Sequence, residues 1–248
     1  MQELSKLILN QYQVRKTKEQ KTAFIELLQK ELKDHKIQVE EGGLVKSRNI
    51  VVGDLEKCEM VLGAHYDTAP VLPFPNFLAP KNMLAYIMYT VLLMLGLFAF
   101  SFVLAFVAMV LTEEPFMAFI CSYVGFLILI LWMFFGKANK NTANDNTSGV
   151  ITLIEALHQE EIKDKVCCVF FDHEESGLFG SAFFAKKHKD ILKDKLVMNF
   201  DCVSDGDHIM FVINKKAEEI RNKLETSFIE ELEKSCKGEM EKITEQFV

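Results

Sequence analysis

Residues 165–175 read KVCCVFFDHEE, and this stretch decides the fold. Apolar residues follow one another without interruption from 166 to 171, which predicts a β-strand that is covered on both of its faces. The run KLVMNF at 195–200 has the same character and predicts a second strand of this kind. Further short apolar runs occupy residues 49–52, 59–64 and 208–213.

Segments with helical periodicity separate these strands. GVITLIEALHQE at 149–160 and GSAFFAKKHKDIL at 180–192 both repeat apolar residues at the spacing of a helix. Residues 17–34 predict an amphipathic helix with Lys or Glu on one side and, on the other, the apolar residues Phe24, Leu27, Leu28 and Leu32. Strands that alternate with helices predict an α/β fold, and we expect a three-layer αβα sandwich around a mostly parallel or mixed sheet.

A long apolar region interrupts this pattern. Residues 82–112 carry no charge, and after Glu113, Glu114 and Pro115 a second uncharged stretch continues to Gly136. A membrane-spanning helix needs about 20 apolar residues, so both stretches qualify. The alternative is a pair of buried helices in a soluble core, but such helices normally carry a polar stripe and these do not. We therefore predict a transmembrane helical hairpin over residues 82–136.

The residues that flank the hairpin predict its orientation. Lys81, Lys137 and Lys140 lie on one side of the membrane, whereas the connecting turn carries only Glu113 and Glu114. By the positive-inside rule, the polar parts of the chain lie in the cytoplasm. We expect an integral protein of the cell membrane in which residues 1–81 and 137–248 form one discontinuous α/β domain. The N-terminus is too polar for a cleavable signal peptide.

Composition excludes one class of partner and suggests a compartment. The net charge is −7, and the chain has no basic cluster of the kind that follows a nucleic-acid backbone. We therefore expect no nucleic-acid binding. The six cysteines follow no zinc-ribbon spacing, and the adjacent pair Cys167 and Cys168 lies in an apolar run. This usage favours a reducing compartment over a disulfide framework.

Acidic residues and one histidine gather where the predicted strands end. His65 and Asp67 follow the run 59–64, Glu174 and Glu175 follow 166–171, and Asp201 follows 196–200. Asp145 lies in the loop NTANDNTSG, just before a predicted helix. In open α/β sheets, ligands bind beyond the carboxyl ends of the strands. These residues are therefore candidates for a single site.

Each residue type has a chemical reason to be there. His65 and Asp67 point to the same side of an extended chain, where a carboxylate can orient an imidazole towards a metal. Glu174 and Glu175 cannot point the same way, so one can bind metal while the other acts as a base on water. Asp145 has two oxygens and could bridge two ions. Two zinc ions that share a carboxylate can activate water and polarise a carbonyl.

Four segments carry a family resemblance in the order GAHYDT, NDNTSGV, DHEESGLFGS and NFD. They resemble metallopeptidase family 28, the bacterial leucyl aminopeptidase group, which also includes relatives of glutaminyl cyclase. The resemblance covers most of residues 15–82 and 137–215. It implies hydrolysis of an amide bond that releases the N-terminal residue of a peptide.

The resemblance also implies a role for each site residue. His65 and Asp201 would hold one zinc ion, Glu175 would hold the other, and Asp145 would bridge them. Glu174 would be the general base, and Asp67 would orient His65.

The chain departs from the family in two respects. The family usually lacks a hairpin between its first histidine and its bridging aspartate. It also supplies a second histidine ligand near its C-terminus, whereas here only His208 follows Asp201, and His208 begins an apparent strand. We therefore expect a C-terminally incomplete peptidase-like domain or a degenerate site. In either case, the chain should bind one zinc ion more firmly than a second.

Three functions remain open from the sequence. The leading interpretation is a membrane-anchored, zinc-dependent aminopeptidase-like hydrolase whose partners are a peptide substrate and the lipid bilayer. The second is a membrane protein whose peptidase-like domain binds peptides or partners without cleaving them. The third keeps the metal centre but carries out glutaminyl cyclisation or removal of an acyl group.

Overall fold

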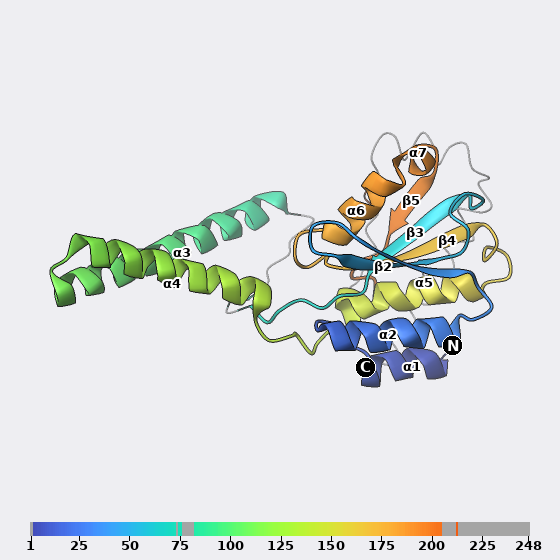
Figure 1. Ribbon diagram of the computed structural model, residues 1–248, viewed down its shortest axis with the longest axis horizontal. Helices are drawn as coiled ribbons and strands as arrows, with labels where there is room; N and C mark the ends of the chain where they lie inside the picture. Colours follow the sequence, from blue (N-terminus) through green and yellow to red (C-terminus); the bar gives the residue numbers. More distant parts are fainter. Residues whose placement is uncertain (1, 73, 76–81, 205–211, 213–248) are drawn as a thin grey trace. The chain divides into compact units, whose positions relative to one another are not determined.

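The computed structural model describes residues 2–72, 74–75, 82–204 and 212 (Figure 1). The chain divides into two compact units, Met1–Ala69 with Asn139–Val248, and Pro70–Ala138. The strand expected at 208–213, apart from Val212, and the charged tail that follows lie outside the described residues.

The first unit contains a mixed five-stranded sheet, which confirms the expected α/β class. Its strands are β1 (Ile37–Gly42), β2 (Ser47–Val52), β3 (Met60–His65), β4 (Val166–Phe171) and β5 (Leu196–Asn199). They lie side by side in the order β1-β2-β4-β3-β5. β3 is parallel to both β4 and β5, whereas β2 is antiparallel to its neighbours β1 and β4. The carboxyl ends of β3, β4 and β5 therefore meet at one edge of the sheet.

Helices lie on both sides of this sheet in Figure 1. On one side are α1 (Gln2–Gln11), α2 (Lys18–Glu31) and α5 (Gly149–His158), and on the other are α6 (Phe179–Lys187) and α7 (Lys189–Leu192). The central strands bury alternate residues towards the two sides, as the two-residue period of a strand requires. Leu62 and Phe170 join the core cluster that contains α5, while Val61 and Val169 join the cluster of Phe184 on α6.

The amphipathic helix predicted at 17–34 is α2, with one exception to its expected pattern. Thr17 caps its N-terminus by accepting a hydrogen bond from the backbone N–H of Gln20, whose side chain bonds back to Thr17. The four predicted apolar residues are all buried. The expectation that every Lys lies on the solvent side is wrong at Lys21, which is 5% exposed. Its ammonium forms a 2.5 Å ion pair with Asp172, and this charged partner compensates for the burial.

One further expectation needs correction, and two elements were missed. β5 is expected to be covered on both faces, but Val197 is 44% exposed, and β5 lies at the edge of the described sheet, where it pairs with β3. β1 and α1 were not predicted at all. In β1 the partly buried Ile37 and Val39 alternate with the exposed Gln38, and this alternation was the available signal.

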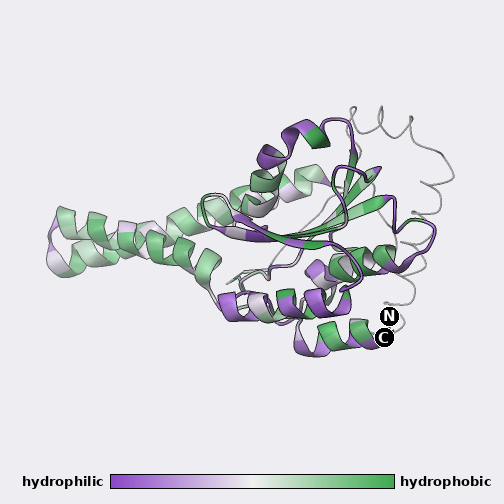
Figure 2. Cartoon of the chain, turned by 45° about the vertical axis from the view of Figure 1, so that its right-hand side comes forward, coloured by the Kyte–Doolittle hydropathy of each residue, from purple (hydrophilic) through white to green (hydrophobic). Residues whose placement is uncertain are grey.

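The second unit consists of the two helices of the hairpin, α3 (Met83–Thr112) and α4 (Pro115–Phe135). Both are long and apolar enough to cross a membrane, and Figure 2 shows them hydrophobic along most of their length. Within the most apolar 18 residues of each helix, only 17% of the residues in α3 and 6% of those in α4 are buried. Small residues allow the helices to pack closely, since a Cβ at Gly125 of α4 would lie 2.1 Å from the Leu104 side chain of α3.

Candidate metal centre

The predicted site residues meet at the carboxyl ends of the parallel strands. His65 is the last residue of β3, Glu174 and Glu175 follow β4, and Asp201 follows β5. Asp145 comes from the turn Ala143–Ser148, which leads into α5. Ligand atoms of His65, Asp145 and Asp201 all lie within 4.8 Å of one another, and so do those of His65, Glu174 and Glu175.

His65 is the centre of this cluster. Its Nε2 lies 3.2 Å from Asp145 Oδ1, 3.7 Å from Asp201 Oδ1 and 4.0 Å from Glu174 Oε2, and the side chain is 2% exposed. Burial by itself lowers the pKa of His65, but its interactions with Asp145, Asp201 and Asp67 outweigh burial and raise that pKa to about 12. The carboxylates therefore strongly favour a positive charge at this position.

One buried atom of the cluster tests whether a metal ion fits. Among the described residues, Oε1 of Glu175 is buried and has no hydrogen-bond partner. Nδ1 of His65 also lacks one, but it faces Asp67, whereas Nε2 faces Asp145 and Asp201. Burial, followed by repulsion from Asp145, raises the pKa of Glu175 to about 8, and burial also raises the pKa of Glu174. A divalent cation would compensate for these crowded carboxylates. One imidazole nitrogen with carboxylate oxygens is a donor set that suits zinc, and it also accepts manganese or cobalt.

Asp67 supports the site in a way that the sequence did not reveal. Its Oδ1 lies 3.6 Å from Nδ1 of His65, which is beyond hydrogen-bonding distance. Its two oxygens instead accept hydrogen bonds from the backbone N–H groups of Glu174 at 3.0 Å and Glu175 at 3.3 Å. Asp67 therefore ties the loop after β4 to the end of β3.

Asn146 holds Asp145 next to the end of β5. Its amide donates to the carbonyl of Phe200 at 2.8 Å, and its Oδ1 accepts from the backbone N–H groups of Gly149 and Cys202. Gly149 has no room for a side chain, because a Cβ there would lie 2.6 Å from the Phe200 carbonyl oxygen. These contacts fix Asp145 and Asp201 relative to each other.

Arg15 is a supporting residue that the sequence reasoning missed. It is fully buried, and its guanidinium donates to the carbonyls of Tyr66 and Tyr12 and to Thr147 Oγ1. Its backbone N–H donates to Thr68 Oγ1. Burial lowers the pKa of Arg15 to about 10, while the negative charge of Asp67 raises it. Arg15 thus joins the segment around His65 and Asp67 to the segment that follows Asp145.

Replacing Arg15 with methionine should lower the free energy of unfolding by about 3 kcal/mol, because the buried carbonyl of Tyr66 and the hydroxyl of Thr147 lose a charged donor. Urea denaturation of the full chain measures this change. Lys36→Met, at an exposed position, is the control and should change stability by less than about 0.5 kcal/mol. Equal stability of the two variants would show that Arg15 does not hold the segments together.

His173 does not join the metal cluster. Its Nδ1 lies 3.2 Å from both Ser47 Oγ and Asp172 Oδ2. Burial by itself raises the pKa of Asp172, but its interactions with His173 and Lys21 outweigh burial and lower that pKa to about 2. Asp172, which also directly follows β4, is therefore part of a separate ionic network beside the site.

Comparison with known families adds independent support. Residues 131–247, slightly less than half of the chain, match the model of the family described as Peptidase family M28. The match supports the M28 family. The matched range contains Asp145, Glu174, Glu175 and Asp201, whereas His65 and Asp67 precede it. Members of the M28 family are metallopeptidases and typically depend on zinc, so the match supports a metal-dependent hydrolase. No curated protein matches the chain.

Proposed function

We propose that the chain is a membrane-anchored, zinc-dependent aminopeptidase, with its α/β unit built as a three-layer αβα sandwich. One observation carries this proposal: His65 and four carboxylates from three other chain segments converge at the carboxyl edge of the sheet. The family match supports the peptidase part. Release of a single N-terminal residue is our inference from the motif resemblance.

The proposed site residues have two roles, as metal ligands and as a general base. His65, Asp145 and Asp201 would hold one ion, and Glu175 with the shared Asp145 would hold a second. Zinc in such a site polarises a carbonyl and lowers the pKa of water. Glu174 would take a proton from the attacking water and deliver it to the departing amine. Its side chain is partly buried, and burial raises its pKa towards the range in which a carboxyl group can both accept and donate a proton.

The decisive experiment for the proposed reaction compares peptides with free and acetylated N-termini, using a panel of aminoacyl substrates. Only the free peptides should be cleaved, with loss of one residue, and a chelator should abolish the activity until zinc is added back. Mass spectrometry of the products measures the result. Cleavage of the acetylated peptides, or cyclisation of an N-terminal glutamine in place of hydrolysis, would contradict the aminopeptidase assignment.

Membrane anchoring rests on the hairpin. Large apolar side chains are exposed along α3 and α4, and a soluble protein rarely exposes so much contiguous apolar surface. The lysines at 137 and 140 follow α4, while the turn between the helices carries Glu113 and Glu114. We infer that the α/β unit lies in the cytoplasm, on the side of these lysines.

The chain should therefore sediment with membranes and resist extraction by alkaline carbonate. Replacing residues 82–136 with a short glycine–serine linker should move it to the soluble fraction, because the apolar helices are then absent. Immunoblotting of the fractions measures both results. A wild-type chain found mainly in the soluble fraction would rule out anchoring by the hairpin.

A further inference from the structure

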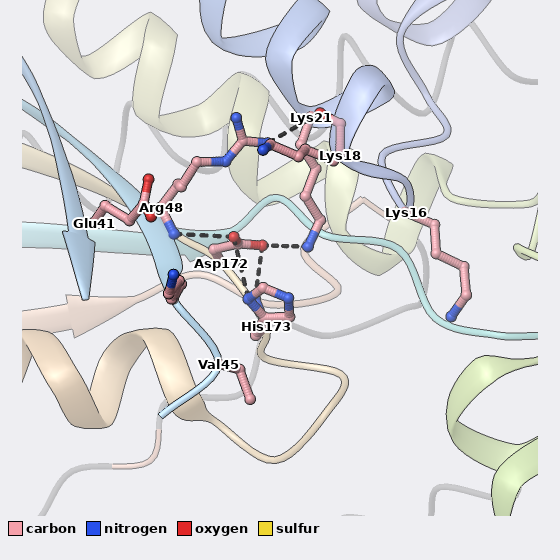
Figure 3. A pocket seen from close by; sticks show the side chains of 9 residues that line it. Lys16, Lys18, Lys21, Glu41, Val45, Arg48, Asp172 and His173 are labelled. Atoms are coloured by element: carbon pink, nitrogen blue, oxygen red, sulfur yellow. Dashed lines mark hydrogen bonds and ion pairs between the residues drawn. The ribbon is translucent and has the colours of Figure 1, made fainter. Parts of the chain in front are cut away.

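A cationic pocket of about 290 Å³ lies in the α/β unit, outside the metal cluster (Figure 3). The residues that line it come from the start of α2, the β1–β2 turn and the loop after β4: Lys16, Lys18, Lys21, Glu41, Val45, Lys46, Arg48, Asp172 and His173. Five are cationic and only two are carboxylates. This excess of positive charge contrasts with the net charge of −7 of the whole chain.

An ion pair between Lys21 and Asp172 offsets only part of this charge. Asp172 already accepts hydrogen bonds from Lys21 Nζ at 2.5 Å and from the backbone N–H groups of His173 and Arg48 (Figure 3). The guanidinium of Arg48 donates to Thr22 Oγ1 and to the carbonyl of Lys18, which are both uncharged. Among the described residues, no carboxylate contacts the guanidinium of Arg48. The pocket therefore favours an anion.

The pocket adjoins the metal cluster. Asp172 and His173 directly precede Glu174 in the chain, so the pocket and the proposed general base share one loop. Burial lowers the pKa of Lys16, while attraction to Asp67 and Glu175 acts in the opposite direction. Lys16 therefore interacts electrostatically with both the carboxylates of the site and the cations of the pocket. A substrate whose scissile bond lies at the cluster would have neighbouring groups within reach of these cations.

We propose that this pocket binds a carboxylate of the peptide substrate, next to the bond that is cleaved. The inference rests on the proposed function and names its substrate class: short peptides that carry either an acidic side chain or a free C-terminal carboxylate close to the N-terminal residue. The volume is roughly ten times the share of one liquid water molecule, so it holds a side chain rather than only a single ion.

Three dipeptides distinguish the two sources of the carboxylate. Alanyl-glutamine amide has no carboxylate, alanyl-glutamate amide has one on its side chain, and alanyl-glutamine has one at its C-terminus. We expect one of the two carboxylate peptides to show a kcat/KM about tenfold above that of alanyl-glutamine amide, which lacks a carboxylate. The preference should weaken as ionic strength rises, because salt screens the charges that attract the peptide.

The variant Lys18→Gln with Lys46→Asn removes two charges from the pocket. Lys46 has a φ of 52°, which asparagine tolerates better than most residues. In this double variant, the preference should fall to within about twofold of unity, since two of the five cations of the pocket are gone and a third, Lys21, is already paired with Asp172. The matched control, Lys30→Gln with Lys33→Gln, removes two exposed charges from the region where α2 ends and should keep the preference.

Calorimetric titration of the same dipeptides into the Glu174→Gln chain measures binding without hydrolysis. This measurement separates the pocket from the proposed function. If the wild-type chain cleaves no peptide, the proposed function fails. The pocket is still supported if a carboxylate peptide binds more tightly than alanyl-glutamine amide and the pocket variant removes that difference. Equal binding of all three peptides, or a preference that survives the pocket variant, would overturn the inference. Inorganic phosphate that binds in the pocket without any preference among the peptides would overturn it too.

Discussion

Replacing Glu174 with glutamine should lower kcat for peptide hydrolysis by about 10³-fold, the size of effect expected when a general base is lost. The amide keeps the shape of the carboxylate but cannot accept the proton of the attacking water. Zinc content should stay close to that of the wild type, because Glu174 is not among the proposed ligands. Single-turnover assays and elemental analysis of the purified chain measure the two quantities.

Two variants make this result specific. Glu161→Gln, at an exposed position that precedes β4 whereas Glu174 follows it, removes the same charge and should leave kcat unchanged. Glu175→Gln should lower both zinc content and kcat, since Glu175 is a proposed ligand with a buried oxygen that has no other partner among the described residues. If Glu174→Gln lost zinc to the same extent, its assigned role would be wrong and it would be a ligand.

Zinc titration of the metal-free chain should show one ion bound at least about tenfold more tightly than a second, because affinity depends on the number of protein ligands. Among the described residues, the proposed ligands of the first ion are His65, Asp145 and Asp201, whereas those of the second would be Glu175 and the shared Asp145. Asp145→Ala should therefore weaken the binding of both ions. Calorimetry with the full chain measures the two affinities.

The control for this titration is Asp194→Ala, which removes a carboxylate at an exposed position after α7 and should leave both affinities unchanged. Two equally tight zinc ions in the wild type would refute the predicted difference between the sites. Unaltered zinc binding in Asp145→Ala would show that Asp145 is not shared between the ions.

Local patterns in the sequence predicted much of the fold. β4 occupies the same residues as the apolar run at 166–171, and the hairpin helices occupy the two uncharged stretches. These elements follow from short runs of residue types, which the chain displays directly. β1 and α1 were missed because their apolar residues are fewer and mixed with polar ones.

The candidate metal ligands were visible in the sequence because each one lies at the end of a strand, within a few residues after one, or shortly before a helix. Parallel pairing of β3 with β4 and β5 then brings those strand ends together. The sequence did not show how Asp67 is used, since its partners are backbone N–H groups of a loop more than 100 positions away. A motif names the residue types but not the hydrogen bonds that position them.

The sequence by itself determined the α/β class, the two long apolar helices and the candidate ligands, because periodicity and strand-end residues are local properties. Only the tertiary structure decided that Arg15 and Lys21 are buried, and that lysines from separate segments line one pocket. Arg15 bonds to residues 51 and 132 positions away, and Lys21 to one 151 positions away. A charged side chain is buried where partners accept its hydrogen bonds, as for Arg15, or carry the opposite charge, as for Lys21, and these partners meet only in the folded chain.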